Sequence, residues 1–491
     1  MYFIGIDIGT SSTKISLFDE KCRIIHSFSK DYETDYPCAG WSEQNPDIWY
    51  NAVSEGIPAL VKGIDPSLIK GIGTGGQMHG LVILDEDDKV IRPAILWNDG
   101  RTEEETDYLN NEIGKERLAE LTGNIAFAGF TAPKLLWLRK HEPENFKKIN
   151  KIMLPKDYIN YRLTGTHASD YSDASGMLLL DVKNKKWSQE MMDICQLTES
   201  QLPSLFESYE CIGEVMPAEA KKLGLSAHVK VVAGAGDNAA AAIGTKTVGE
   251  GECNISLGTS GTIFISSESF REDENNGLHS FAHADGRFHL MGCILSAASC
   301  NKWLMDKVLF SKDYEKEQEK IELDDLGNNH VFFLPYLMGE RSPINDVNAR
   351  GTFTGLSLET ERKDLVQAVL EGVSFAIRDN VEVARKLGIR IEESKVCGGG
   401  AKSRLWLKIL ANVLDMKLII PHNEQGPSLG AAMLAMVGCG AYADVSQASE
   451  QMTEAVDIID PEPTIVMRYD AQYKKYKQIY PTMKTLFKAI V

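Results

Sequence analysis

The sequence lacks a long apolar run, an excess of basic residues and a secretion signal, and each absence excludes a class of function. No stretch of about 18 uncharged apolar residues occurs, so we expect no transmembrane helix. The 52 Lys and Arg residues are outnumbered by 70 Asp and Glu, for a net charge of −18. This balance argues against nucleic acid or an anionic membrane as the main partner. Because no basic segment precedes an apolar stretch and a small-residue cleavage site, we predict no signal peptide.

The cysteines also lack a pattern. No Cys-x-x-Cys occurs and the nine cysteines are an odd number, so we expect free thiols and a cytoplasmic location. The nine are scattered along the chain: Cys22, Cys38, Cys195, Cys211, Cys253, Cys293, Cys300, Cys397 and Cys439. His283 and His289 lie close to Cys293 and Cys300 in sequence, but their spacing fits no zinc template, so a metal site there is not favoured.

The chain is long for one domain. Its 491 residues exceed the roughly 250–300 at which a single core stops growing, so two large domains are expected. Apolar residues make up 43% and charged residues 25%, which is ordinary for a globular protein. Strand-like runs alternate with helical stripes, as at residues 229–243 and 395–414, and this favours an α/β fold. A linker-like segment at 244–251 leads us to predict domains at residues 1–245 and 246–491.

The two halves contain similar hairpins. Residues 3–9 and 14–18 read as two strands joined by a small-hydroxyl turn, and residues 254–257 and 263–265 repeat the pattern. The turn Gly9-Thr10-Ser11 matches Gly258-Thr259-Ser260, 249 positions further on. One such match is expected by chance in Gly/Ser-rich loops. Its position at the start of each predicted domain favours an internal duplication.

Hairpin tips of this kind suit phosphate. Glycine permits close approach of the backbone, while hydroxyls and turn N–H groups donate to phosphate oxygens. Each tip alone is equally consistent with an ordinary turn, but two tips facing across a cleft would hold a triphosphate from both sides. Asp7 lies in the first strand among apolar neighbours, where a buried carboxylate needs a cation or donors. A Mg²⁺ ion that retains waters is the cation that we expect; the alternative is an edge-strand Asp that faces solvent.

Two further segments place polar groups where strands end. Residues 398–403, GGGAKS, follow a short strand and begin a helix. They match neither of the nucleotide-binding motifs G-x-x-x-x-G-K-(S/T) and G-x-G-x-x-G. They nevertheless bring flexible backbone to a helix N-terminus. A tight structural turn is the alternative. Asp237 follows Gly-Ala-Gly at another strand end. It is suited to act as the general base of a phosphoryl transfer, and an N-cap role is compatible with that chemistry.

Three polar segments could bind a polyhydroxylated ligand. Residues 76–80 contain one histidine, residues 97–101 combine Trp, Asn, Asp and Arg, and residues 339–343 read Gly-Glu-Arg-Ser-Pro. An aromatic ring can cover a sugar C–H face while polar groups reach its hydroxyls. The alternatives are a structural histidine and a structural Glu–Arg pair at a hinge.

In this order, the motifs resemble those of the FGGY family of carbohydrate kinases over nearly the whole chain. The matching segments are GIDIGTSSTK (5–14), GQMHG (76–80), LWNDGR (96–101), DYSDASG (170–176), GAGDNAA (234–240), SLGTSG (256–261), GERSPINDVNARG (339–351) and GGGAKS (398–403). Within the 339–351 signature, Ile344 and Val347 replace the more usual His and Pro. The resemblance implies a two-domain ribonuclease-H-like fold, of the actin-like ATPase and sugar kinase type, with an interdomain cleft.

The resemblance also implies a reaction and its residues. It is closest to the branch of the family that phosphorylates D-xylulose at its 5-hydroxyl with ATP and Mg²⁺. Asp237 and Asp7 would be catalytic, with Asp7 near Mg²⁺ largely through water. The sugar would contact Met78, His79, Asn98, Asp99, Asp237 and Asn238. ATP would contact Thr10, Ser11, Ser12, Gly258, Thr259, Ser260, Gly399, Gly400 and Ala401.

Several alternatives stay open from the sequence. The nearest is a sister kinase for ribulose, gluconate or another polyol. A non-catalytic sugar sensor, or a polymerising or chaperone-type ATPase, would share the fold. Retention of Asp7, Asp237 and the sugar loops argues against these last two classes. The oligomeric state, a homodimer included, is not determined by the pattern.

Overall fold

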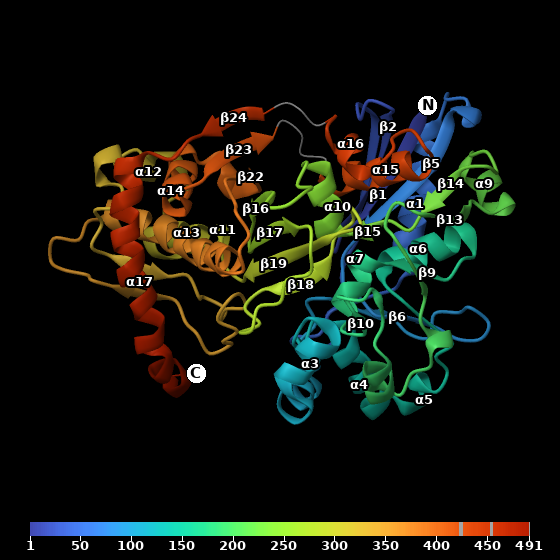
Figure 1. Cartoon of the computed structure of the whole chain (residues 1–491), viewed down its shortest axis with the longest axis horizontal. Coiled ribbons are helices and arrows are strands. Elements are labelled where there is room, and N and C mark those ends of the chain that lie inside the picture. The colour runs from blue at the N-terminus through green and yellow to red at the C-terminus, as the bar shows by residue number, and fades with distance from the viewer. Residues whose placement is uncertain (422–425, 452–454, 491) are drawn as a thin grey trace.

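Two seven-stranded sheets form the centres of two lobes in the computed structural model (Figure 1), which describes residues 1–421, 426–451 and 455–490. The first sheet has the order β13-β14-β5-β1-β2-β3, with β15 also paired to β5. Its strands are β1 (Tyr2–Ile8), β2 (Ser12–Asp19), β3 (Ile24–Asp31), β5 (Ile69–Gly76), β13 (Cys211–Glu214), β14 (Lys230–Val232) and β15 (Ala235–Gly236).

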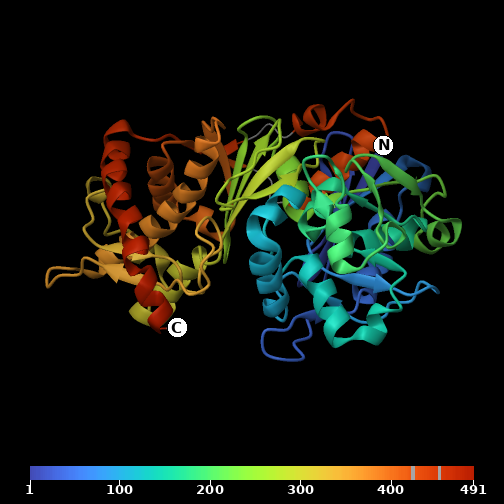
Figure 2. The same ribbon diagram turned by 60° about the horizontal axis from the view of Figure 1, so that its bottom comes forward.

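The second sheet has the order β18-β19-β17-β16-β22-β23-β24. Its strands are β16 (Cys253–Leu257), β17 (Gly261–Ser267), β18 (His279–Ala282), β19 (Phe288–Ile294), β22 (Glu393–Cys397), β23 (Lys417–Pro421) and β24 (Ala455–Ile459). Figure 2 shows the two lobes side by side from a second direction.

The two sheets repeat one topology. In the first, β1 pairs antiparallel with β2 and parallel with β5, and β5 continues in parallel to β14, which is followed by antiparallel β13. In the second, β16 pairs antiparallel with β17 and parallel with β22, and β22 continues in parallel to β23, which is followed by antiparallel β24. The duplication that the hairpin repeat predicts is therefore present in the strand order and direction.

Helices cover both faces of the first sheet. Side chains alternate along β1: Ile4, Ile6 and Ile8 pack toward α1 (Asp47–Val61) and α6 (Pro155–Thr164). Phe3 packs on the opposite face with α10 (Asp237–Gly244) and α15 (Gly426–Gly438). A β-carbon on Gly5 would lie 1.8 Å from the carbonyl oxygen of Ser428 in α15, so the close approach of this helix requires glycine in the strand. Asp7 lies on the same face by alternation.

Helices α13 (Arg362–Lys386), α14 (Arg404–Leu414) and α17 (Pro463–Ile490) build the core of the second lobe against its sheet. The helical stripes at residues 366–377 and 406–414 fall within α13 and α14, as predicted. Helix α15 comes from the second half of the chain but packs on β1 and β5 of the first sheet. The division at residues 245 and 246 therefore stays a prediction about sequence segments, since the packing of α15 crosses it.

The remaining helices connect or extend the lobes. The larger ones are α3 (Lys115–Thr122), α4 (Thr131–His141), α8 (Gln189–Cys195), α9 (Pro217–Leu223) and α11 (Ala298–Trp303). Short helices also occur at α7 (Tyr171–Ala174) and α12 (Tyr314–Gln318). In the part of the chain that the structure describes, no helix is both long and apolar enough to cross a membrane.

Candidate active site

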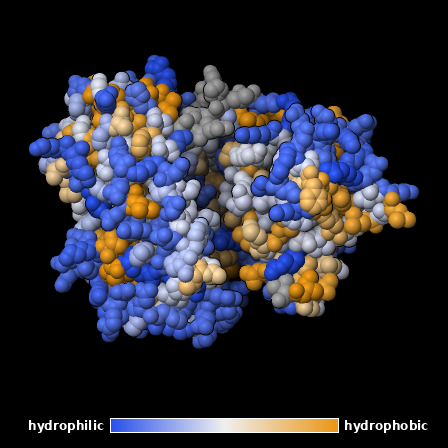
Figure 3. All heavy atoms as spheres, turned by 180° about the vertical axis from the view of Figure 1, so that it is seen from behind, coloured by the Kyte–Doolittle hydropathy of each residue, from blue (hydrophilic) through white to orange (hydrophobic). Residues whose placement is uncertain are grey.

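Figure 3 shows the cleft between the lobes from behind; two cavities are lined by residues of both halves of the chain, and a third by residues of the second half. The smallest, about 160 Å³, is the sugar-side cavity. It is lined by residues of both lobes: Met78, His79, Trp97, Gly129, Phe130, Asp237, Asn238, Ser260, Thr262, Met291, Cys293 and Arg341. Residues predicted separately from the sequence thus meet in one space.

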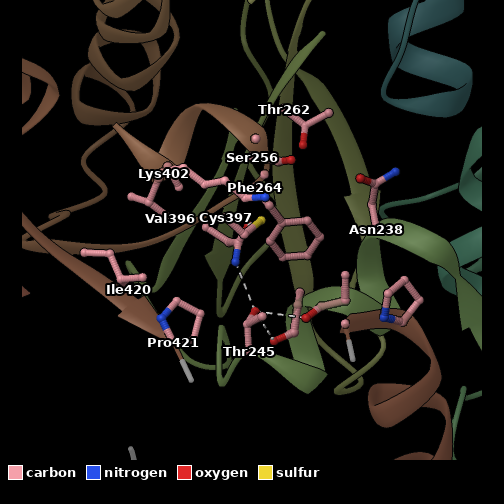
Figure 4. A pocket seen from close by; sticks show the side chains of 18 residues that line it. Asn238, Thr245, Ser256, Thr262, Phe264, Val396, Cys397, Lys402, Ile420 and Pro421 are labelled. Atoms are coloured by element: carbon pink, nitrogen blue, oxygen red, sulfur yellow. Dashed lines mark hydrogen bonds between the residues drawn. The ribbon is translucent and has the colours of Figure 1, made fainter. Parts of the chain in front are cut away.

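Two larger cavities lie toward the second lobe. One of about 570 Å³ lies between α10 and the second sheet; Figure 4 shows Asn238 on one side of it and Val396 and Cys397 on the other. It shares Asn238 and Thr262 with the sugar-side cavity. The other, about 730 Å³, is lined by Thr259, Gly399, Gly400 and Trp406 among others, and we call it the outer cavity. Gly399 and Lys402 line both of the larger cavities.

Asp237 is the first residue of α10 and faces the sugar-side cavity. The N-cap residue is Gly236, so the N-cap role considered for Asp237 is not the one observed. Its Oδ1 instead accepts hydrogen bonds from the backbone N–H and Nδ2 of Asn238, at 2.7 and 2.9 Å. Burial raises the pKa of Asp237 to about 6, against the lowering effect of these two bonds. The carboxylate is therefore positioned, and basic enough, to accept a proton near neutral pH.

Asp7 occupies an interior strand rather than a sheet edge. It pairs with Lys14 of β2 and with Gly75 of β5. Burial, and then the nearby Asp237 carboxylate, raise the pKa of Asp7 to about 7, while Lys14 lowers it. Among the described residues no protein donor hydrogen-bonds to its side chain. Such a carboxylate, close to a second one, is electrostatically suited to a cation.

Met78 and His79 form one wall of the sugar-side cavity. The His79 ring stacks on Phe130 with 4.6 Å between centroids, and burial lowers its pKa to about 3. Its Nδ1 lies 2.8 Å from the carbonyl oxygen of Gly176. A carbonyl only accepts, so Nδ1 carries the proton and Nε2 is left as an acceptor. A neutral His79 can therefore receive a hydrogen bond from a ligand hydroxyl.

The predicted Trp-Asn-Asp cluster divides into different roles. Trp97 lines the cavity and donates from Nε1 to Thr10 Oγ1 at 2.8 Å. Asn98 is exposed and does not line the cavity. Asp99 is buried; it forms an ion pair with Arg101 at 2.7 Å and accepts from the Ser42 N–H at 2.6 Å. The structure therefore gives Asp99 a structural environment, and direct sugar contacts by these two residues stay predictions.

The two hairpin tips differ in their relation to the cavities: residues of the second tip line two of them, whereas Thr10, Ser11 and Ser12 of the first tip line none of the three. Ser260 lines the sugar-side cavity and Thr259 the outer cavity. The second tip is held from behind, where the N–H groups of Ala297 and Ala298 donate to the carbonyls of Thr259 and Gly258 at 2.9 and 2.8 Å. In the first tip, Thr10 Oγ1 donates to Gln77 Oε1 at 3.2 Å, which links the tip to the 76–80 segment. Ser11 is exposed and Ser12 begins β2.

The GGGAKS segment surrounds the nucleotide-side space. Gly398 has φ of +88°, a conformation that favours glycine, and begins a short 3₁₀ turn from Gly399 to Lys402. The N-cap of α14 is Ser403, whose side chain accepts from the Trp406 N–H. Gly399 and Gly400 line the outer cavity, and Ala401 lines the cavity between α10 and the second sheet.

Sequence reasoning missed part of the second-lobe contribution to the sugar-side cavity. Thr262, Met291 and Cys293 line it and were not among the predicted site residues. For the 339–343 segment, the cleft-lining alternative applies to Arg341, while Glu340 is buried and accepts from the N–H groups of Leu295 and Arg341 at 2.8 Å each. Met291 and Cys293 lie in strand β19, where nothing in the sequence pattern indicates which face is turned to the cleft.

The described part of the site holds separate carboxylates, hydroxyls and backbone groups rather than a cluster of metal-ligating side chains. Among the described residues, no group of three or more His, Cys, Asp or Glu side chains is placed to hold a metal ion. His283 instead contacts the carbonyl oxygen of Thr247 through Nε2 at 2.9 Å. A buried carboxylate and hydroxyl-bearing residues around one cavity are groups that phosphoryl transfer can use.

Comparison with known proteins identifies the family. The N-terminal domain model of the FGGY carbohydrate kinases matches residues 2–244, and the C-terminal domain model matches residues 253–439. The chain is 42% identical to the xylulose kinase of Escherichia coli over 437 residues, which covers 89% of this chain and 90% of that one.

Solved structures share the whole architecture. A xyloylose kinase from Brucella ovis superposes with a TM-score of 0.94 at 38% identity, covering 99% of this chain and 100% of the other. A gluconate kinase from Lactobacillus acidophilus gives a TM-score of 0.94 at 28% identity, covering 100% and 99%. The predicted two-domain ribonuclease-H-like fold and the ATP-dependent kinase class are confirmed. The chain belongs to the FGGY family of carbohydrate kinases.

Proposed function

We propose that this protein transfers the γ-phosphoryl group of ATP to the 5-hydroxyl of D-xylulose and forms D-xylulose 5-phosphate. The observation that carries the proposal is the placement of Asp237 in one small cavity with Met78 and His79. The xylulose kinase relatives, similar over nearly the full length, support the choice of sugar. The gluconate kinase of the same fold makes gluconate the specific alternative.

In this proposal the sugar lies against the first lobe. Trp97 covers a C–H face, and the neutral His79 accepts a hydroxyl hydrogen bond through Nε2. Asp237 orients the 5-hydroxyl and accepts its proton as the oxygen attacks phosphorus. With a pKa of about 6, this base is ionised at neutral pH and still basic enough to accept a proton.

ATP lies on the second lobe. Adenosine occupies the outer cavity beside Gly399 and Gly400, with Ala401 adjacent, and the triphosphate runs toward the sugar between the two hairpin tips. Thr10, Ser11 and Ser12 donate from one lobe, and Gly258, Thr259 and Ser260 from the other. Approach of the lobes then excludes water, which would otherwise compete with the sugar hydroxyl.

Asp7 is the residue that would hold Mg²⁺. Its side chain has no protein donor among the described residues and its pKa is raised to about 7, so a nearby cation would relieve the repulsion from Asp237. One carboxylate with retained waters and substrate phosphates is the usual protein environment of this ion. When bound, Mg²⁺ would neutralise phosphate charge; the remaining tasks of binding, orientation and proton acceptance belong to the protein.

A coupled ADP-release assay over D-xylulose, D-ribulose, gluconate and glycerol tests the substrate. We expect D-xylulose to give the highest kcat/KM. A response to gluconate alone would overturn the choice of sugar, and ADP release that ignores every sugar would overturn the kinase reaction. A cytoplasmic location and a homodimer are further proposals; light scattering after size exclusion tests the second.

A further inference from the structure

Directly behind Asp237 lies a buried cluster of charged residues for which the reaction described above has no use. Lys156 Nζ lies 2.6 Å from Asp157 Oδ1, 2.9 Å from Asp170 Oδ1 and 3.7 Å from Asp173 Oδ2. All four side chains are fully buried. Because burial of charge is costly unless it is paired, such a cluster needs an explanation.

One member of the cluster connects to the catalytic segment. Asp170 Oδ2 accepts from Ser172 Oγ at 2.5 Å, from the Ser172 N–H at 2.8 Å and from Ser208 Oγ at 2.7 Å. The Ser172 hydroxyl therefore has its proton committed to Asp170. Its oxygen in turn accepts from the backbone N–H of Gly236 at 3.2 Å. A chain of contacts thus runs from Lys156 through Asp170 and Ser172 to Gly236.

Gly236 is the residue immediately before Asp237 and the N-cap of α10. On one side it pairs in parallel with Gly76 of β5. On another, a β-carbon at Gly236 would lie 2.9 Å from Cγ of Met78. The hydrogen bond to Ser172 Oγ also holds this peptide unit, because the Gly236 N–H would otherwise be a buried donor with no partner. The direction in which Asp237 leaves the backbone depends on that unit.

We propose that Ser172, held by Asp170 and Lys156, is a positioning residue that fixes the Gly236–Asp237 peptide and thereby aims the Asp237 carboxylate at the substrate hydroxyl. This inference rests on the proposed role of Asp237. Ser172 does not line the sugar-side cavity, so its effect passes through the backbone. A displacement of a reacting group by about 1 Å is enough to lower a rate by roughly a hundredfold.

The cluster explains why the contact is rigid. Asp170 Oδ2 accepts three short hydrogen bonds, and Lys156 forms an ion pair with Asp170 Oδ1. Asp173 donates its backbone N–H to Asp170 Oδ1 at 3.4 Å, whereas both of its carboxyl oxygens are buried without a hydrogen-bond partner in the described part of the chain. Burial raises the pKa of this carboxyl well above the ordinary value, which disfavours a further charge in the cluster.

Ser172→Ala tests the proposal, with Ser208→Ala as its matched control. Both variants remove one hydroxyl donor from the same Asp170 oxygen, and both residues are buried, but only Ser172 reaches Gly236. We expect Ser172→Ala to lower kcat about ten- to hundredfold with KM for D-xylulose and ATP nearly unchanged, and Ser208→Ala to keep kcat within about twofold. Ser172→Thr, which retains the hydroxyl, should recover most of the rate.

Thermal unfolding of the variants separates positioning from simple destabilisation. We expect similar Tm losses for Ser172→Ala and Ser208→Ala but different kcat values. Equal kcat in the two variants, or wild-type kcat in Ser172→Ala, would overturn the proposal. If Ser172→Ala does not fold, Ser172→Cys, with a similar shape and a weaker hydrogen bond, is assayed in its place. Asp237→Asn in the same series shows which proposal has failed. If Asp237→Asn is active, Asp237 is not the base. If Asp237→Asn is inactive while Ser172→Ala is fully active, only the positioning role of Ser172 is rejected.

Discussion

The two matching hairpins have the same antiparallel strand pairing but differ in chemistry. With the turns Gly9-Thr10-Ser11 and Gly258-Thr259-Ser260 aligned, Asp7 corresponds to Ser256. The structure supports this equivalence, because Asp7 pairs with Gly75 of the parallel neighbour β5, and Ser256 pairs with Cys397 of the parallel neighbour β22. Only the first copy has a carboxylate at this position.

The two helices that meet between the lobes show the same asymmetry. Helices α10 and α15 pack so closely that a β-carbon on Gly430 would lie 1.8 Å from the carbonyl oxygen of Ala240. Helix α10 begins with Asp237 and α15 with Gly426. In the proposed reaction each copy therefore contributes one phosphate-binding turn, whereas both carboxylates, Asp7 and Asp237, come from the first copy. The predictions below test this division.

The largest expected effect is that of removing the Asp237 carboxylate. Asp237→Asn keeps the side-chain shape but cannot accept the proton, so we expect kcat to fall by about 10²–10⁴-fold, the usual contribution of a general base. D-Xylulose affinity, measured by isothermal titration calorimetry, should stay within about threefold. In the wild type, activity should rise as the pH passes upward through about 6, where Asp237 ionises. Full activity in Asp237→Asn would remove it from the role of base.

A smaller loss is expected at Asp7, with its counterpart as the control. Asp7→Asn removes the charge that would hold Mg²⁺, so we expect roughly a hundredfold lower kcat, at the low end of the range for one charged catalytic group, and a higher Mg²⁺ concentration for half-maximal rate. Ser256→Ala changes the equivalent position of the second hairpin and should keep kcat within about threefold. Equal losses in the two variants would show that the copies share the chemistry.

The same carboxylates should lower stability at neutral pH. Burial raises the pKa of Asp7 to about 7 and of Asp237 to about 6, from 3.8. Between pH 4 and 7 the folded state therefore binds more protons than the unfolded state, and stability falls as the pH rises through this range. We expect Asp237→Asn to raise Tm at pH 8 by about 2–4 °C, the usual shift for 1 kcal/mol in a domain of this size, and to have no such effect at pH 4. A Tm difference that does not depend on pH would contradict the assignment of a charged, destabilising Asp237.

Much of the fold could be predicted because duplication leaves a signature in local sequence. The matching turns, the strand runs at residues 229–233 and 395–397, and the helical stripes of α13 and α14 depend on neighbouring residues, so a linear pattern reveals them. The return of α15 to the first lobe could not be predicted. It depends on Gly5 and Gly73 meeting α15 carbonyls at a contact distance that admits no side chain, a match between segments more than 350 positions apart.

Sequence reasoning finds residues that line one cavity where the chemistry requires a particular residue type. Asp237, Met78 and His79 line one cavity as the motif pattern indicated. Asp99 shows the limit of such reasoning. A carboxylate can bind a sugar hydroxyl, yet Asp99 is buried in an ion pair with Arg101. The guanidinium carbon of Arg101 in turn lies 3.8 Å from the centre of the Trp41 ring. Residue type indicates what a side chain can bind, but packing decides which neighbour it contacts in the folded protein.

The smallest expected effects distinguish the two threonines at the hairpin tips. Thr259 is exposed and lines the outer cavity only, so Thr259→Ala should raise KM for ATP by about threefold to tenfold, the value of one hydrogen bond, and leave KM for D-xylulose unchanged. Thr10 Oγ1 also accepts from Trp97 and donates to Gln77. Thr10→Ala should therefore raise KM for both substrates, because Trp97 loses its anchor over the sugar. Steady-state kinetics with each substrate varied in turn decides the matter: identical KM changes in the two variants would mean that the tips are equivalent, and that the asymmetry between the copies is confined to the carboxylates.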